Sequence, residues 1–139
     1  MSTVADVFHV EVVTPAGGIV LSREAGHVRL PGLMGSFGVL AGHADMVAAL
    51  GTGVATVEEK GGVTVRLALS GGYAQVKAGK LLVLAESAEL PERVDAARAE
   101  AARDRARARL SQGGDADVER AQASLARAMN RLELLGLRK

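Results

Sequence analysis

The sequence predicts a β-sandwich, or flattened antiparallel barrel, over residues 1–88, followed by an α-helical hairpin over residues 89–139. The first observation is that 14 of the 17 glycines fall in residues 1–90, among short apolar runs. The second is that 12 alanines and 11 of the 17 basic residues fall in residues 91–139. The third is Pro91, which stands at this break and suits the first turn of a helix. Two kinds of structure therefore meet near Pro91.

Each strand is predicted from a short apolar run that ends near a glycine. These runs are Phe8–Val13, Ile19–Leu21, Gly26–Leu30, Gly53–Val57, Val63–Leu69 and Leu81–Ala85. The glycine-bearing segments Glu58–Gly62 and Lys77–Lys80 predict hairpin turns between neighbouring runs. No helical segment is long enough for a crossover, so we expect about eight to ten strands in antiparallel order.

The helical hairpin is predicted from its caps and its apolar spacing. The first helix should begin at Pro91 and end near Leu110, with acidic residues at the positive end of its dipole. Glycines interrupt the pattern at 113 and 114, and Asp115 or Asp117 can cap a second helix over about residues 116–135. An apolar seam follows that helix through Val118, Ala121, Leu125, Ala128, Leu132 and Leu135. Because the first helix offers mainly alanine, each contact forgoes about 2 kcal/mol relative to leucine. We therefore expect that the hairpin can leave its docked position.

Composition excludes several classes of protein. Seventeen Lys and Arg balance sixteen Asp and Glu, which argues against a strongly basic nucleic-acid binder. The chain contains no cysteine, so disulfides, thiolate metal sites and cysteine nucleophiles are excluded. No apolar run reaches the roughly 18 residues of a membrane span, and Met1–Val7 lacks the features of a secretory signal. We therefore expect a soluble cytoplasmic protein.

The densest glycine cluster, from Pro31 to Asp45, resembles a phosphate loop only superficially. It lacks the Gly-Lys-Ser/Thr ending of a Walker loop and the Gly-x-Gly-x-x-Gly pattern of a dinucleotide loop. We interpret its glycines as tight turns where strands change sheet. Ser36, His43 and Asp45 raise the hypothesis of a small hydrolase, but neither a nucleophile elbow nor a metal-ligand pattern supports it. We expect no catalytic residues and no metal site.

The arginines of the tail are the other candidate site. Arg98 and Arg105 are seven residues apart and Arg127 and Arg131 four apart, so each pair can share a helix face. If the hairpin folds shut, their four guanidinium groups form an anion trap suited to a polyphosphate. The alternative is a solvated face with local ion pairs, such as Asp95 with Arg98. Both readings remain open from the residues alone.

The order of motifs along the chain is more specific than any single motif. The segments in question are Phe8–Pro15, Gly32–Asp45, Leu50–Gly53, Leu69–Val76, Val83–Ala88, Val94–Ala99 and Arg127–Leu132. Together they make nearly the whole chain resemble the epsilon chains of bacterial F-type ATP synthase, called delta in mitochondria. The family usually has proline before the Gly-His pair and after His-Ala. This chain has Ala41 and Asp45 there, so we expect a less rigid loop.

The resemblance implies a non-catalytic rotor subunit in the central stalk of a proton-translocating ATP synthase. Its sandwich would clasp the gamma subunit and rest on the ring of c subunits. By position, the loop residues Leu33, Met34, Gly35, Ser36 and Phe37 would face the c ring, and Thr14 and His43 would lie near the gamma contact. Such a protein would be peripheral on the cytoplasmic face of the bacterial inner membrane and would reach the membrane only through the complex.

The resemblance also gives the tail a regulatory role. The hairpin would extend to the alpha and beta subunits of the catalytic head and inhibit ATP hydrolysis, using Arg103, Arg105, Arg107 and Arg109. These arginines are spaced by two, which spreads them around a helix and argues against nucleic acid as their partner. No cofactor is required, and ATP is a possible regulatory ligand at Glu89, Asp95, Arg98, Arg105, Arg127 and Arg131. The rival hypotheses are a stand-alone ATP-sensing module and the small hydrolase.

Overall fold

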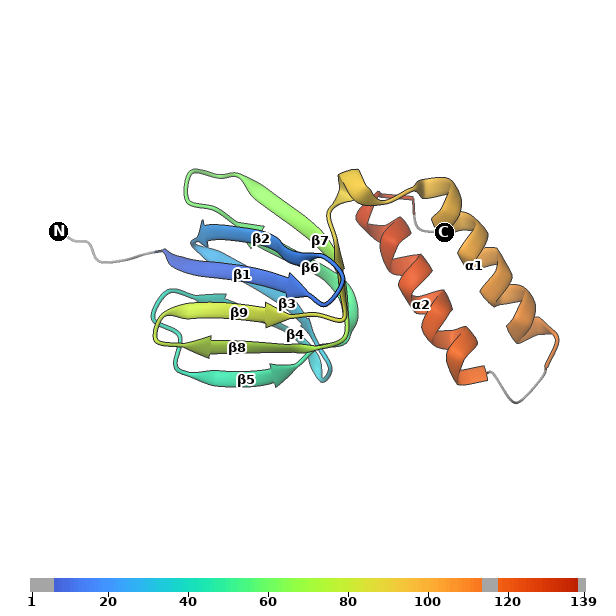
Figure 1. The fold of residues 1–139 in the computed structure, drawn as a ribbon, viewed down its shortest axis with the longest axis horizontal. Coiled ribbons are helices and arrows are strands. Elements are labelled where there is room, and N and C mark those ends of the chain that lie inside the picture. Colours follow the sequence, from blue (N-terminus) through green and yellow to red (C-terminus); the bar gives the residue numbers. More distant parts are fainter. Residues whose placement is uncertain (1–6, 114–117, 138–139) are drawn as a thin grey trace. The chain divides into compact units, whose positions relative to one another are not determined.

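The computed structural model describes residues 7–113 and 118–137. The chain divides between Glu89 and Leu90 into two compact units. The first unit holds the strands and the second the helices (Figure 1). No helix in the described part of the chain is long and apolar enough to span a membrane.

Ten strands form two five-stranded sheets in the described part of the first unit (Figure 1). Sheet A has the order β2-β1-β9-β8-β5 and sheet B the order β10-β7-β6-β3-β4. The strands are β1 (Phe8–Thr14), β2 (Gly18–Ala25), β3 (His27–Gly32), β4 (Gly35–Leu40), β5 (Met46–Ala49), β6 (Thr52–Glu58), β7 (Thr64–Ser70), β8 (Tyr73–Lys77), β9 (Lys80–Leu84) and β10 (Ser87–Glu89). No strand belongs to both sheets, so the described strands make a sandwich and not a closed barrel.

The core lies between the inner faces of the two sheets, because successive side chains of a strand point to opposite faces. In β1 the burial pattern alternates along the whole strand. Sheet A contributes Val10, Val12, Leu81 and Val83, and sheet B contributes Val28, Leu30, Val57, Leu67 and Leu69, each at most 2% exposed. This burial holds the two sheets together and fixes which residues face outward.

The strand predictions are confirmed over most of the sandwich, with two differences. The predicted turns do connect β6 to β7 and β8 to β9. The first difference is that β1 pairs with β9 in parallel, because no short connection forces these distant strands into a hairpin. The second is that the cluster Pro31–Asp45, interpreted as turns, contains β4 and borders β5. Gly35 and Gly38 of this cluster lie inside β4, where they pair with Gly32 and Arg29 of β3.

The helical unit begins later than predicted. Residues Pro91–Arg93 form a 3-10 turn and Val94 is extended, so α1 runs from Ala96 to Ser111 instead of starting at Pro91. Asp95 is the N-cap, and its carboxylate accepts a hydrogen bond from the Arg98 backbone N–H at 3.1 Å. A side-chain N-cap defines the first residue of a helix more strictly than the preference of proline for the first turn does.

The second helix, α2, runs from Val118 to Leu134. The proposed caps Asp115 and Asp117 lie outside the described residues. Of the predicted seam, Ala121, Ala128 and Leu132 are at most 2% exposed, and Ala99 and Ala106 are the buried residues of α1. The seam prediction is confirmed in part: Val118 and Leu125 are only half-buried, Leu135 lies beyond the end of α2, and Leu134, outside the predicted seam, is buried.

Candidate docking surfaces and an arginine face

The tip of the β3–β4 hairpin exposes two large apolar side chains. Leu33 is 67% exposed and Met34 is 98% exposed. The tip is fixed to the sandwich by its backbone: the Leu33 N–H donates to the Ala49 carbonyl and the Gly51 N–H to the Pro31 carbonyl, both at 2.9 Å. A held turn that presents leucine and methionine to solvent is typical of a contact surface.

The other three residues of the predicted c-ring loop belong to β4 and differ in exposure. Gly35 and Ser36 are exposed, and the Ser36 hydroxyl accepts from the Arg29 guanidinium at 3.3 Å. Phe37 is half-buried, in register with the buried Leu30 of β3. The exposed apolar part of the loop is therefore Leu33 and Met34.

A second apolar surface crosses the outer face of sheet A. The register places five side chains in one row across all five strands, in the order Ile19, Val13, Leu84, Tyr73 and Ala49. We call this the apolar row. Ile19 is 62% exposed, Tyr73 60% and Leu84 48%, and the neighbouring Val47 of β5 is 70% exposed. Exposed apolar side chains gathered on one face mark an interaction surface more strongly than scattered ones do.

The apolar row and the hairpin tip lie at the same end of the sandwich. The Ala49 carbonyl, at the end of the row, accepts the hydrogen bond from Leu33. The β1–β2 turn and the β3–β4 hairpin also lie at this end of the first unit (Figure 1). The two surfaces therefore form neighbouring parts of one exposed apolar region.

The apolar row is not among the features predicted from the sequence. The signal is present in Leu81–Leu84 and in Val12–Val13, where apolar residues follow one another without alternation. Such a run predicts a strand whose two faces are both covered. In this unit one face of that strand packs in the core and the other faces solvent.

The structure does not bring Thr14 and His43 together. Thr14 ends β1 at the apolar end of sheet A and is 7% exposed, and its hydroxyl accepts from the Gly17 N–H at 2.9 Å. His43 lies in the β4–β5 loop, next to Asp45, whose carboxylate accepts from the Ala78 N–H at 3.2 Å. Ala78 is in the β8–β9 turn, beside Lys80 at the start of β9, whereas Thr14 lies near Leu84 at the end of β9. At 3.3 Å per residue, these two ends of β9 are about 13 Å apart. Asp45 thus ties this loop to the β8–β9 turn.

The residues of the hydrolase hypothesis are also separated. Ser36 lies at the start of β4 and His43 beyond its end. The His43 Nδ1 lies 2.7 Å from the Ala44 carbonyl oxygen, and Asp45 is bonded to the Ala78 N–H. A nucleophile, its base and an orienting carboxylate must lie within hydrogen-bond reach of one another. The described geometry does not form such a triad.

On the helical unit, the four predicted phosphate-binding arginines lie on one side of the hairpin. Residues of an α-helix follow at about 100° intervals, so Arg105 and Arg107 lie on opposite sides of the buried Ala106. Arg127 and Met129 likewise flank the buried Ala128. The Arg107 guanidinium contacts the Met129 sulfur at 3.7 Å. Arg105 and Arg127 are therefore on the other side, together with the residues that share their faces, Arg98 and Arg131.

The predicted head-contact arginines divide between the two sides. Arg103 and Arg107 share the side of Met129, and the side chain of Arg103 is 16% exposed and pairs with Asp104 at 3.0 Å. Arg105 and Arg109 share the other side and are exposed. Of the remaining ATP-site predictions, Asp95 caps α1 and Glu89 belongs to β10 of the sandwich unit. The Arg127 guanidinium donates to the Ser124 hydroxyl at 3.3 Å.

Comparison with known proteins assigns both units. Residues 7–91 match the beta-sandwich domain of the ATP synthase delta/epsilon chain, and residues 92–136 match the long alpha-helix domain of the same chain. The ATP synthase epsilon chain of Nitratidesulfovibrio vulgaris (strain DP4) is 43% identical over 92% of this chain and 95% of its own length. That of Desulforamulus reducens is 41% identical over 88% of this chain and 92% of its own length.

Solved structures agree with this assignment. A chain of the mitochondrial ATP synthase of Euglena gracilis, in an assembly of OSCP, F1 and c ring, superposes with a TM-score of 0.72 and 25% identity. It covers 98% of this chain and 81% of its own. These matches define a subunit of a rotary ATP synthase. The chain belongs to the ATP synthase delta/epsilon family, and its bacterial relatives are epsilon chains.

Proposed function

We propose that this chain is a non-catalytic rotor subunit that joins the gamma subunit to the c ring of a proton-translocating ATP synthase. In this role it is peripheral, on the cytoplasmic face of the bacterial inner membrane, and reaches the membrane only through the complex. The observation that carries the proposal is the exposed apolar region of the sandwich, formed by the apolar row and the hairpin tip. Such a surface offers contact area without catalytic groups, which is what a coupling subunit needs.

We assign the apolar row to gamma and the hairpin tip to the c ring. Burying Tyr73 and Leu84 against a partner stabilises the complex by about 1.5–3 kcal/mol for each side chain. The test is retention of the chain by immobilised gamma. Tyr73→Ser with Leu84→Ser should abolish retention, whereas Val63→Ser should not, since Val63 is 55% exposed but lies outside sheet A. Equal retention of both variants contradicts the assignment.

The hairpin tip has its own test in the assembled rotor. Leu33→Ser with Met34→Ser should weaken attachment of the gamma-bound chain to isolated c rings, with gamma binding unchanged. The matched control is Leu40→Ser, because Leu40 is 59% exposed and ends the same strand pair at its far end. Loss of attachment in the control as well contradicts a specific role of the tip.

We further propose that the helical unit restrains ATP hydrolysis by contact between its arginines and the alpha and beta subunits. Its exposed arginines on two sides of the hairpin, such as Arg105 and Arg107, suit several modest acidic contacts. Salt should weaken these contacts. The test is ATP hydrolysis by the assembled complex with and without this unit.

ATP is proposed as a regulatory ligand of the arginine face formed by Arg98, Arg105, Arg127 and Arg131. The support is that the two helices bring these four residues to one side of the hairpin. Guanidinium groups bind phosphate through paired hydrogen bonds. Calorimetry on the full chain should detect binding at millimolar ATP, and Arg127→Ala with Arg131→Ala should remove it. A chain that binds ATP but is not retained by gamma would instead support the stand-alone ATP-sensing module.

A further inference from the structure

A hollow lies on the outer face of sheet A, beside the apolar row. Its volume is about 280 Å³, and its lining includes Glu11, Gln75, Lys77, Lys80 and Leu82. We call it the lysine hollow. Leu82 lies two residues before Leu84 on β9, so the hollow and the apolar row are about 7 Å apart. A partner seated on the apolar row therefore reaches the lysine hollow.

The two lysines of the hollow face each other across the β8–β9 pair, on either side of the turn whose Ala78 N–H donates to the Asp45 carboxylate. Lys77 and Lys80 are direct cross-strand partners in the β8–β9 pair, and both are exposed. Like charges directly opposite each other on a sheet are destabilising. Neither ammonium group forms an ion pair with a carboxylate among the described residues. The hollow is thus lined by the apolar Leu82 and by two lysines that form no ion pair among the described residues.

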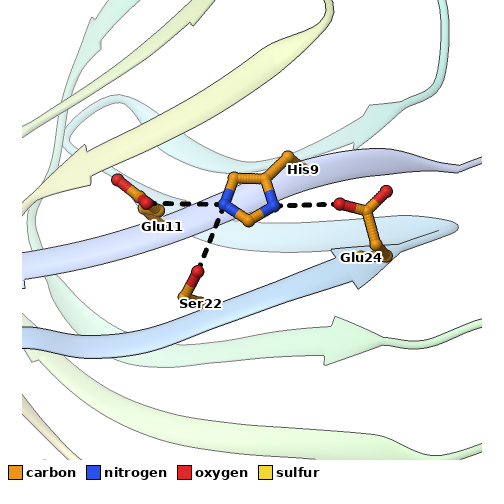
Figure 2. A network of polar contacts seen from close by, with 4 residues as sticks. All are labelled: His9, Glu11, Ser22 and Glu24. Carbon is orange, nitrogen blue, oxygen red and sulfur yellow. Dashed lines mark hydrogen bonds and ion pairs between the residues drawn. The ribbon is translucent and has the colours of Figure 1, made fainter.

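The one carboxylate of the lining, Glu11, is engaged elsewhere. Its Oε2 lies 3.4 Å from the His9 Nε2, while the His9 Nδ1 lies 2.9 Å from the Glu24 carboxylate. The Ser22 hydroxyl is 3.2 Å from the same Nε2 (Figure 2). Glu11 therefore contacts His9 while it also lines the hollow. The polar network of β1 and β2 therefore leaves the two lysines for another acceptor.

We propose that the lysine hollow receives an aspartate or glutamate side chain of the central-stalk partner that docks on the apolar row. This inference rests on the proposed function. The apolar row is uncharged and extends across the sheet, so it gives affinity but little control of orientation. A carboxylate bound between Lys77 and Lys80 fixes the orientation of the partner and accelerates its encounter, because complementary charge acts on the association rate.

The test is binding of the full chain to purified gamma, followed by surface plasmon resonance at several salt concentrations. The variant Lys77→Gln with Lys80→Gln keeps most of each side chain and removes the charge. We expect its association rate at low salt to fall about tenfold and its salt dependence to flatten. The pair Lys77→Arg with Lys80→Arg keeps the charge and should associate as the unchanged chain does. Lys60→Gln, in the β6–β7 turn, is the matched control.

The outcomes separate this inference from the proposed function. Suppose that Tyr73→Ser with Leu84→Ser abolishes binding, but Lys77→Gln with Lys80→Gln associates with unchanged rate and salt dependence. The lysine hollow then has no such role, and the assignment of the apolar row to gamma stands. If Tyr73→Ser with Leu84→Ser binds gamma normally, the assignment of the apolar row to gamma is wrong, and the inference fails with it. If Lys77→Gln with Lys80→Gln and Lys77→Arg with Lys80→Arg slow association equally, side-chain packing and not charge is responsible. That result also overturns the proposed role of the lysine hollow.

Discussion

Gly72 shows how one residue positions the apolar row. It stands in the β7–β8 turn with φ +101°, directly before Tyr73 of the apolar row. A Cβ at this position would overlap the Leu84 carbonyl oxygen, and Leu84 is the cross-strand partner of Tyr73. Only glycine allows this close approach of two backbones together with a left-handed conformation.

We therefore predict that Gly72→Ala destabilises the sandwich by about 3 kcal/mol, through backbone strain and steric overlap. Urea unfolding of the full chain measures this loss. The control is Gly79→Ala, because Gly79 also has positive φ, at +76°, but a Cβ there meets nothing within 4 Å. The control should lose only about 1 kcal/mol. Equal losses would show that overlap with Leu84 contributes nothing.

At the scale of elements, the sequence predicts those whose signal is local. The apolar run of β9 and the glycine turns beside it identify strands, since alternation and turn chemistry act within a few residues. The orientation of β9 beside β1 could not be predicted, because this pairing joins distant segments. β4 could not be predicted, because Gly35 and Gly38 favour a turn locally, whereas pairing with β3 makes that segment a strand.

The candidate site follows the same division. The resemblance predicts that Leu33 and Met34 contact the c ring, and the structure shows that both side chains are exposed. The apolar row required the register of five strands, which no single segment contains. The arginine face was predictable because spacings of four and seven are set by the helix itself. Which side of the hairpin it occupies depends on the packing of α1 on α2, seen in the contact of Arg107 with Met129.

The start of α1 is set by the cap at Asp95. Its carboxylate accepts from the Arg98 N–H, which otherwise has no partner within the helix. We predict that Asp95→Ala destabilises the first turn of α1 by about 1 kcal/mol. Amide hydrogen exchange at residues 96–99 should accelerate about fivefold, while exchange in α2 stays unchanged. Glu92→Ala is the control, since Glu92 lies in the preceding 3-10 turn. Equal acceleration in both variants would contradict the capping role.

At the scale of the whole molecule, the chain has two units with separate cores and opposite charge. Residues 1–89 carry six basic and eight acidic residues, for a net charge of −2, and residues 90–139 carry eleven and eight, for +3. The division falls between Glu89 and Leu90. The core of the sandwich is made by its own strands. We predict that residues 1–89 fold alone, with amide chemical shifts in β1, β6 and β9 matching those of the full chain. Loss of shift dispersion in this fragment would contradict separate cores.

The same division predicts how the units act in the complex. Removing residues 90–139 leaves the apolar row and the hairpin tip intact, so we expect the shortened chain to assemble with gamma and the c ring. ATP hydrolysis by that complex should be several-fold faster than with the full chain, because the arginines of α1 and α2 no longer reach the acidic surfaces of the head. Raising the salt from 50 to 300 mM should accelerate hydrolysis with the full chain and leave the shortened complex unaffected, since screening weakens exposed ion pairs. Full assembly with unchanged hydrolysis at both salt concentrations would assign the helical unit a role other than restraint, and would leave the coupling role of the sandwich in place.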